Sequence, residues 1–163
     1  MIYEVEGDIL LTRAQVIAHG VAVNDTMTRG LARKLQEKFP TMREEFHAWC
    51  EEHNSEPGEC WHWGDFDKQQ VANLIIMEGA DPAINHPGRA TRVATHRALR
   101  NLCSLALEKR FTSIAMPVLG DEHSGLDWPT VSDMLHSQLK ELLIPIFVYT
   151  KEKEGQLASE PGM

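Results

Sequence analysis

Residues 114–128 read IAMPVLGDEHSGLDW. An apolar run that suits a buried strand ends at Pro117, and a polar loop with two glycines then leads to Trp128. A strand that passes through such a loop into a helix is typical of an α/β sheet, in which ligands bind beyond the carboxyl ends of the strands. The stretch therefore predicts a fold class and the edge of the sheet where a ligand lies.

The rest of the chain alternates strand-like and helix-like segments. Apolar or alternating runs predict strands over 2–5, 16–23, 59–63, 71–77, 113–116 and 144–149. Apolar residues three or four apart predict helices over 30–39, from 42 to at least 50, over 91–108 and over 128–142. Strands that recur with helices between them imply a three-layer α/β/α fold with a mixed, largely parallel central sheet.

Bulk properties limit the class of protein. The 163 residues suit a single domain, which we place at 1–150, and the polar residues 151–163 suggest a disordered tail. A net charge of −8 argues against broad adhesion to nucleic acid or to an anionic membrane. No apolar run suits a membrane span, no signal pattern begins the chain, and three widely spaced cysteines are not a disulfide framework. We therefore expect a cytoplasmic protein without membrane contact.

Two loops carry the candidate binding site. VNDTMTRGLA (23–32) follows the second predicted strand, VLGDEHSGLDW (118–128) follows the penultimate one, and both enter helices. A glycine at the start of a helix lets backbone N–H groups approach an anion, which the helix dipole also favours. Two such loops across one sheet predict a diphosphate site. Taken singly, each glycine is better explained by an ordinary turn.

These segments also resemble a known family. VEGDIL (5–10), VIAHGVAVND (16–25), RGLARKLQEKFP (29–40), IAMPVLG (114–120), SGLDW (124–128) and IFVYT (146–150) resemble a macrodomain in their order and spacing. They are most similar to the macrodomains that remove terminal ADP-ribose from protein or DNA. The resemblance implies the macrodomain fold and a chain that binds ADP-ribose or ADP-ribosylated protein or nucleic acid. We expect a monomer that needs no cofactor.

The resemblance implies a role for each matching residue. Asp8 would accept a hydrogen bond from the adenine amino group, with Ile9 and Tyr149 beside the base, and Asn24 would contact the distal ribose. The first phosphate loop would comprise Gly30, Leu31 and Ala32, and the second Leu119, Gly120, Ser124, Gly125 and Leu126. The residues alone leave alternatives: Asp8 as a cap, Asn24 in a turn, Tyr149 in the core, and His19 as a buried core histidine.

Catalysis is left open by the same comparison. Some relatives that cleave an ADP-ribosyl ester use a lysine nucleophile where this chain has Met77, Glu78 and Gly79. A general base for water attack could come instead from the second loop, which offers Asp121, Glu122 and His123. The alternatives are hydrolysis of an ADP-ribosyl linkage, removal of phosphate from ADP-ribose 1″-phosphate, and binding without turnover.

Two further clusters have competing interpretations. Zinc ligands could come from His47, Cys50, His53, Cys60 and His62, but helix and strand geometry favours packing and surface roles, so we expect no metal. A positive stripe at helical spacing comprises Arg89, Arg92, His96 and Arg100. It could guide a polyanion such as ADP-ribosylated nucleic acid, or it could be a solvated helix face.

Overall fold

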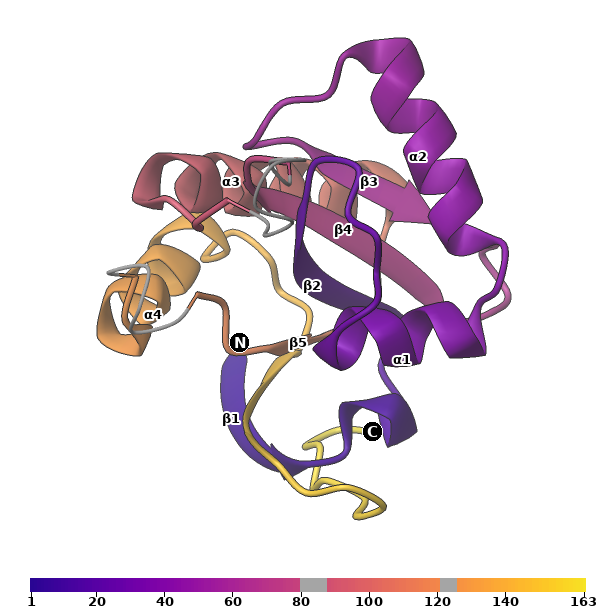
Figure 1. Ribbon diagram of the computed structural model, residues 1–163. Coiled ribbons are helices and arrows are strands. Elements are labelled where there is room, and N and C mark those ends of the chain that lie inside the picture. Colours follow the sequence, from indigo (N-terminus) through magenta and orange to yellow (C-terminus); the bar gives the residue numbers. More distant parts are fainter. Residues whose placement is uncertain (80–87, 121–125) are drawn as a thin grey trace.

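A computed structural model describes residues 1–79, 88–120 and 126–163, and its centre is one six-stranded sheet (Figure 1). The strands are β1 (Ile2–Gly7), β2 (Val16–Ala22), β3 (Cys60–Trp63), β4 (Gln70–Met77), β5 (Ile114–Pro117) and β6 (Ile146–Glu152). Their order across the sheet is β1-β6-β5-β2-β4-β3. All neighbouring pairs are parallel except β3 with β4, so the predicted mixed, largely parallel sheet is confirmed.

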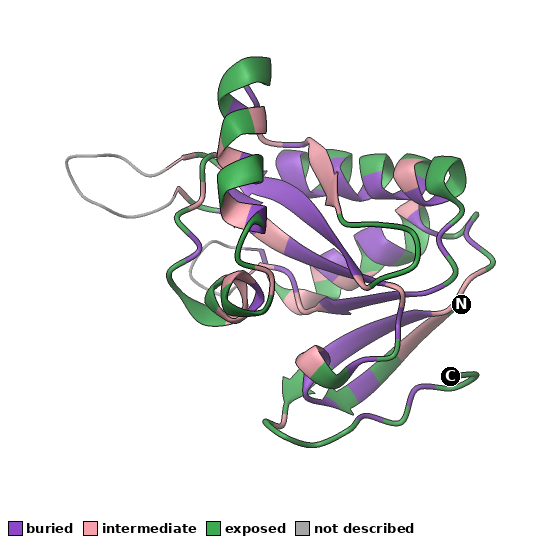
Figure 2. Cartoon of the chain, turned by 90° about the vertical axis from the view of Figure 1, so that its right-hand side faces the viewer, coloured by how far each residue is buried: buried purple, intermediate pink, exposed green. Residues whose placement is uncertain are grey.

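Helices cover both faces of this sheet. The elements are the short 3-10 helix η1 (Ile9–Leu11), α1 (Gly30–Lys38), α2 (Met42–His53), α3 (Arg92–Lys109) and α4 (Trp128–Gln138). One apolar layer joins α3 and α4 to alternate residues of the central strands, and a second joins the other face to α1, α2 and η1. Figure 2 shows the buried strands enclosed between the partly exposed helices. The three-layer prediction is therefore confirmed.

Local sequence explains where the helices begin and end. Thr91 caps α3 by accepting the Ala94 N–H at 3.1 Å, and Arg110 ends this helix in the left-handed conformation. Asp127 caps α4 by accepting the Thr130 N–H at 2.9 Å. The helix ends at Gln138, four residues before the predicted end, because the chain turns at Leu139 while keeping Leu139 and Leu142 buried. Residues three apart, such as Leu139 and Leu142, can both be buried in a helix or in a turn. The apolar spacing therefore could not show whether the helix continued.

The C-terminal end differs from the expected disordered tail. Strand β6 continues to Glu152, beyond the expected domain boundary at 150, and the following residues turn back along β1 toward η1 (Figure 1). Ala158 and Glu160 are buried there. A polar composition indicated disorder, but the buried Ala158, the hydrogen-bonded Glu160 carboxylate and backbone hydrogen bonds dock this segment.

Candidate functional site

A cleft lies at the carboxyl ends of the parallel strands, as the strand-to-helix loops predicted. It consists of two hollows of about 360 Å³ and about 390 Å³. Leu31, Pro117 and Val118 line both hollows, so the two lie next to each other, and we call the boundary between the start of α1 and the end of β5 the neck. Such a two-part cleft suits an elongated ligand with a group at each end and a linker between them.

The first hollow is bordered by the loop between β2 and α1, and Asp25 shapes this loop. Its carboxylate accepts the Ala22 N–H at 2.9 Å and the Met27 N–H at 2.8 Å. On the other side, His47 of α2 lies 2.6 Å from the Asp25 carbonyl oxygen. Asn24 lies exposed at the cleft with a φ of 53°, a conformation that asparagine tolerates well. Asp25 therefore has a structural role that leaves Asn24 facing the hollow.

The neck is bordered by the N-terminus of α1. Arg29 occupies the capping position in an extended conformation, and within the described chain its side chain makes no capping hydrogen bond. Gly30 begins the helix at a φ of +54°, and a β-carbon there would meet no atom within 4 Å. Leu31 and Ala32 line the cleft. The first N–H groups of a helix have no intrahelical partner, so this end can receive an anion.

The second loop is described only at its two ends. Leu119 and Gly120 line the first hollow, and Leu126 is buried in the core. A β-carbon on Gly120, whose φ is +79°, would lie 2.7 Å from the Leu126 carbonyl oxygen. The two ends of the loop therefore meet closely. Five residues predicted for the site lie outside the described residues, namely Asp121, Glu122, His123, Ser124 and Gly125.

The second hollow contains the predicted adenine-end residues Asp8, Ile9 and Tyr149. Asp8 is 7% exposed, and its carboxylate accepts the N–H groups of Leu10 at 3.0 Å and Gly155 at 2.9 Å. It caps η1, as the alternative interpretation held, and it also borders the hollow. The Tyr149 hydroxyl donates to Glu160 at 3.0 Å, and burial raises the pKa of Tyr149.

Some residues of the second hollow were missed in the sequence. Lys34 lies one helical turn after Gly30 on α1, so its i+4 spacing was an available signal. Glu152 lies at the end of β6, where burial and the nearby charge of Asp8 raise its pKa. No signal in the sequence marked this position, because β6 was expected to end at Tyr149.

The residues considered as zinc ligands contact different parts of the protein. His53 lies 3.1 Å from the Trp49 carbonyl oxygen, His62 lies 2.5 Å from the Gln70 side chain, and burial raises the pKa of Cys50. Burial also raises the pKa of Cys60 to about 12. Within the three described ranges, no three His, Cys, Asp or Glu side chains are grouped so that they could hold a metal ion.

The core position of His19 agrees with its sequence interpretation. The residue is 2% exposed and its ring contacts the Asn73 side chain, although His19 also borders the first hollow. Met77, at the position where some relatives have a lysine, lines the same hollow. Among the described helices, none has both the length and the apolar character needed to cross a membrane.

Comparisons with known proteins agree with this geometry. Residues 19–135 match the Macro domain family. The chain is 26% identical over 152 residues to a DNA ADP-ribosyl glycohydrolase of Thermus aquaticus, which covers 91% of the chain and 41% of that protein. The chain thus spans about two fifths of the length of this relative.

Solved structures share the fold. The macrodomain of Thermus aquaticus DarG superposes with a TM-score of 0.79 at 23% identity, covering 92% of this chain and 98% of that one. Thermosipho africanus DarTG in complex with ADP-ribose gives a TM-score of 0.75 at 19% identity, and the match covers 96% of this chain and 42% of that one. The family match extends over most of the residues that form the sheet and cleft, so the resemblance seen in the sequence is confirmed. The chain belongs to the Macro domain family.

Proposed function

We propose that the cleft binds ADP-ribose, with adenine in the hollow beside Asp8 and the distal ribose in the hollow beside Asn24. The diphosphate would then lie in the neck at the N-terminus of α1. The observation that carries this proposal is the neck itself, where Leu31, Pro117 and Val118 border both hollows next to a helix start that carries no side-chain cap in the described chain.

The chemistry of each hollow supports this orientation. The Asp8 carboxylate has acceptor positions beyond the two backbone N–H groups it already accepts, and an adenine amino group is a donor. Ile9 and Tyr149 offer apolar and aromatic surface to a base. The opposite hollow offers polar groups to a ribose, including Asn24, Thr26 and Thr28.

The proposed reaction is hydrolysis of an ADP-ribosyl linkage to a macromolecule. The Thermus aquaticus relative is named as a DNA ADP-ribosyl glycohydrolase, which supports DNA as the acceptor. In this reaction a base takes a proton from water, and the water oxygen attacks the anomeric carbon of the distal ribose. The bond from that carbon to the acceptor breaks, its electron pair stays on the acceptor atom, and the acceptor is released after taking up a proton. We propose Asp121, Glu122 or His123 as the base, because they directly follow Gly120, which lines the first hollow.

The exposed surface beside the first hollow supports a nucleic-acid acceptor. Ala90 lines that hollow and α3 begins two residues later. The first half of α3 exposes Arg92, Arg97 and Arg100, and its sequence from Arg92 to Leu107 contains no acidic residue. In a chain with a net charge of −8, this positive face suits a phosphate backbone that leaves the distal ribose.

Binding without turnover is the alternative, and it has one specific observation in its favour. Met77 lines the first hollow where relatives with a covalent mechanism place a lysine, and a thioether cannot form a Schiff base. A reader of ADP-ribosylation would need only the cleft. Removal of phosphate from ADP-ribose 1″-phosphate would use the same cleft and the same second loop.

One assay separates these functions. The chain is incubated with ADP-ribosylated DNA, ADP-ribosylated protein and ADP-ribose 1″-phosphate, and released product is measured beside calorimetric binding of ADP-ribose. Release from DNA that is lost in Glu122→Ala or His123→Ala, but kept in the distant Glu141→Ala control, supports the hydrolase. Tight binding without release from any of the three substrates supports the reader.

We also propose that the chain acts as a monomer in the cytoplasm. All three cysteines are free, which suits a reducing compartment. Sedimentation at micromolar concentration tests the oligomeric state, and a dimer at that concentration would contradict it.

A further inference from the structure

The segment that follows β6 runs directly beside the base-binding end of the cleft. The Lys153 N–H donates to the Gly7 carbonyl at 3.0 Å, and the Asp8 N–H donates to the Gln156 carbonyl at 2.7 Å. Between them, the Gly155 N–H donates to the Asp8 carboxylate at 2.9 Å. We call residues 153–160 the C-terminal segment. It binds both the backbone and the side chain of Asp8.

Glu160 anchors the far end of this segment. Its carboxylate accepts the Thr12 hydroxyl at 2.5 Å, the Arg13 N–H at 2.9 Å and the Tyr149 hydroxyl at 3.0 Å. The residue is only 9% exposed. Three donors from two distant parts of the chain satisfy this buried carboxylate, so its loss would leave buried donors without an acceptor.

Close packing leaves little freedom between the anchor and Asp8. A β-carbon on Gly7 would lie 2.8 Å from the Ala158 β-carbon and 2.9 Å from the Gln156 carbonyl oxygen. The absence of a side chain at Gly7 therefore lets the C-terminal segment lie against the residue that precedes Asp8.

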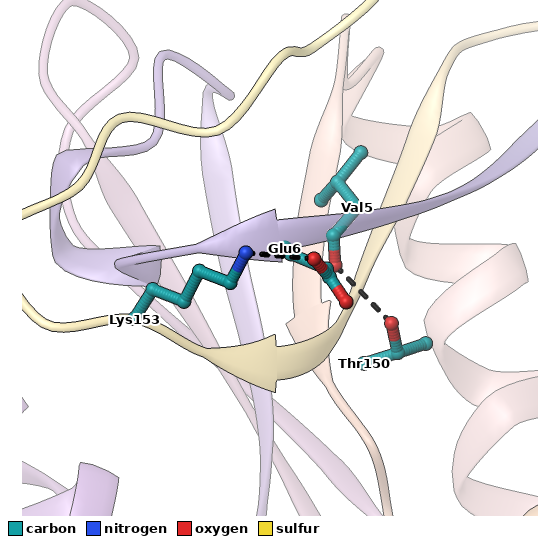
Figure 3. Close-up of polar contacts among 4 residues, drawn as sticks. All are labelled: Val5, Glu6, Thr150 and Lys153. Atoms are coloured by element: carbon teal, nitrogen blue, oxygen red, sulfur yellow. Dashed lines mark hydrogen bonds and ion pairs between the residues drawn. The ribbon is translucent and has the colours of Figure 1, made fainter.

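Side-chain contacts with β1 also hold the junction between β6 and the C-terminal segment. Figure 3 shows Lys153 paired with Glu6 at 2.8 Å and the Thr150 hydroxyl donating to the Val5 carbonyl at 3.3 Å. The Lys153 ammonium lowers the pKa of Glu6 through this contact. Both side chains of the pair reach solvent, so the pair adds little stability. The positioning of Asp8 depends on the buried contacts instead.

We propose that the C-terminal segment is a positioning element that fixes the Asp8 carboxylate for recognition of the adenine amino group. This inference rests on the proposed binding of ADP-ribose. One carboxylate oxygen accepts Leu10 of η1 and the other accepts Gly155 of the segment, so both oxygens are oriented before a ligand arrives. A side chain that is already ordered loses less conformational entropy on binding. Glu160 also accepts the hydroxyl of Tyr149, which lines the same hollow, but the apolar and aromatic surface of Tyr149 serves adenine and hypoxanthine alike. Only the path through Asp8 distinguishes an amino group from a carbonyl oxygen.

The test compares two ligands and a matched pair of variants. The ligands are ADP-ribose and its analogue with hypoxanthine in place of adenine, which presents a carbonyl oxygen where adenine has an amino group. The variants are Glu160→Gln, at the buried anchor, and Glu154→Gln, at an exposed position of the same segment. Calorimetry gives the ratio of the two dissociation constants for each protein.

We expect the wild-type chain and Glu154→Gln to prefer ADP-ribose equally. Glu160→Gln should reduce this preference by about tenfold, because a mobile Asp8 no longer separates donor from acceptor. A general loss of folding would weaken the binding of both ligands together and leave the ratio of their dissociation constants unchanged. The milder Thr12→Val, which removes one of the three donors to Glu160, should reduce the ratio by about threefold and decides the case if Glu160→Gln does not fold.

Two outcomes separate failure of this inference from failure of the proposed function. If the wild-type chain binds neither ligand, the proposed function is wrong and the inference falls with it. If the wild-type chain prefers ADP-ribose and Asp8→Asn abolishes the preference, while the folded Glu160 and Thr12 variants retain it, the C-terminal segment does not position Asp8.

Discussion

The side chains of His19 and Asn73 meet at 2.6 Å between the paired strands β2 and β4. Both residues are buried, and His19 borders the first hollow of the cleft. Burial lowers the pKa of His19 to about 4, and the contact with Asn73 opposes this only in part. A neutral imidazole is therefore built into the sheet beneath the candidate ribose site.

Because the pKa of His19 is lowered in the folded chain, we expect the free energy of unfolding to depend on pH. Below a pH of about 6.5 the unfolded chain protonates His19, whereas the folded chain does so only near pH 4. The unfolding free energy should therefore fall as the pH decreases through this range, by about 3 kcal/mol from His19 alone. Urea unfolding at several pH values measures the slope. His19→Gln should flatten it, and the exposed His96→Gln control should not; equal slopes in both variants would contradict the assignment.

The glycines of the two loops predict a graded effect on stability. Gly30 and Gly120 both have positive φ, but only Gly120 would bring a β-carbon against Leu126. Gly30→Ala should lower the unfolding free energy by about 1 kcal/mol through backbone conformation alone. Gly120→Ala adds a collision with a carbonyl oxygen and should cost about 1 to 3 kcal/mol more. Denaturant unfolding compares them, and an equal cost would show that the loop ends do not meet closely.

The hydrogen bonds of Asp25 indicate that the loop between β2 and α1 holds its conformation before a ligand binds. Asp25→Ala removes the acceptor for two backbone N–H groups and should lower the unfolding free energy by about 1 to 3 kcal/mol. Because the loop borders the first hollow, affinity for ADP-ribose should fall as well. Asp25→Asn keeps one carbonyl acceptor and should give an intermediate value in both measurements. If Asp25→Ala binds ADP-ribose like the wild type, the loop does not organise the site.

The arginines of α3 predict a difference between free and attached ADP-ribose. Arg92→Ala and Arg100→Ala should weaken binding to ADP-ribosylated DNA at low salt and leave binding of free ADP-ribose unchanged. Each should also reduce the slope of log affinity against log salt by about 1. Lys109→Ala, at the other end of the helix, is the control. Equal losses for both ligands would place these arginines outside an acceptor surface.

The fold could be predicted from local sequence because its elements carry strong periodic patterns. Val16–Ala22 and Gln70–Met77 are almost entirely buried apolar runs, and α3 shows its buried stripe plainly. The end of α4 was misplaced because a turn kept the same leucines buried. Sequence patterns report which residues are buried more directly than they report the backbone conformation.

The site could be predicted only where it depends on local geometry. Asn24 and Gly30 lie in a loop that follows a strand, so their places at the cleft followed from topology, whereas Asp8 was placed there by the resemblance to macrodomains. The role of Glu160 could not be predicted, because its partner Thr12 lies 148 positions away in the chain. Contacts of that range depend on the path of the last residues, and polar composition alone indicated that those residues were disordered.

The most direct test is a crystal structure of the chain with ADP-ribose bound. The proposed function predicts adenine against Asp8 and Ile9, the diphosphate at the N–H groups that begin α1, and the distal ribose beside Asn24. A nucleotide bound elsewhere, or a cleft that stays closed to ADP-ribose at saturating concentration, would contradict it.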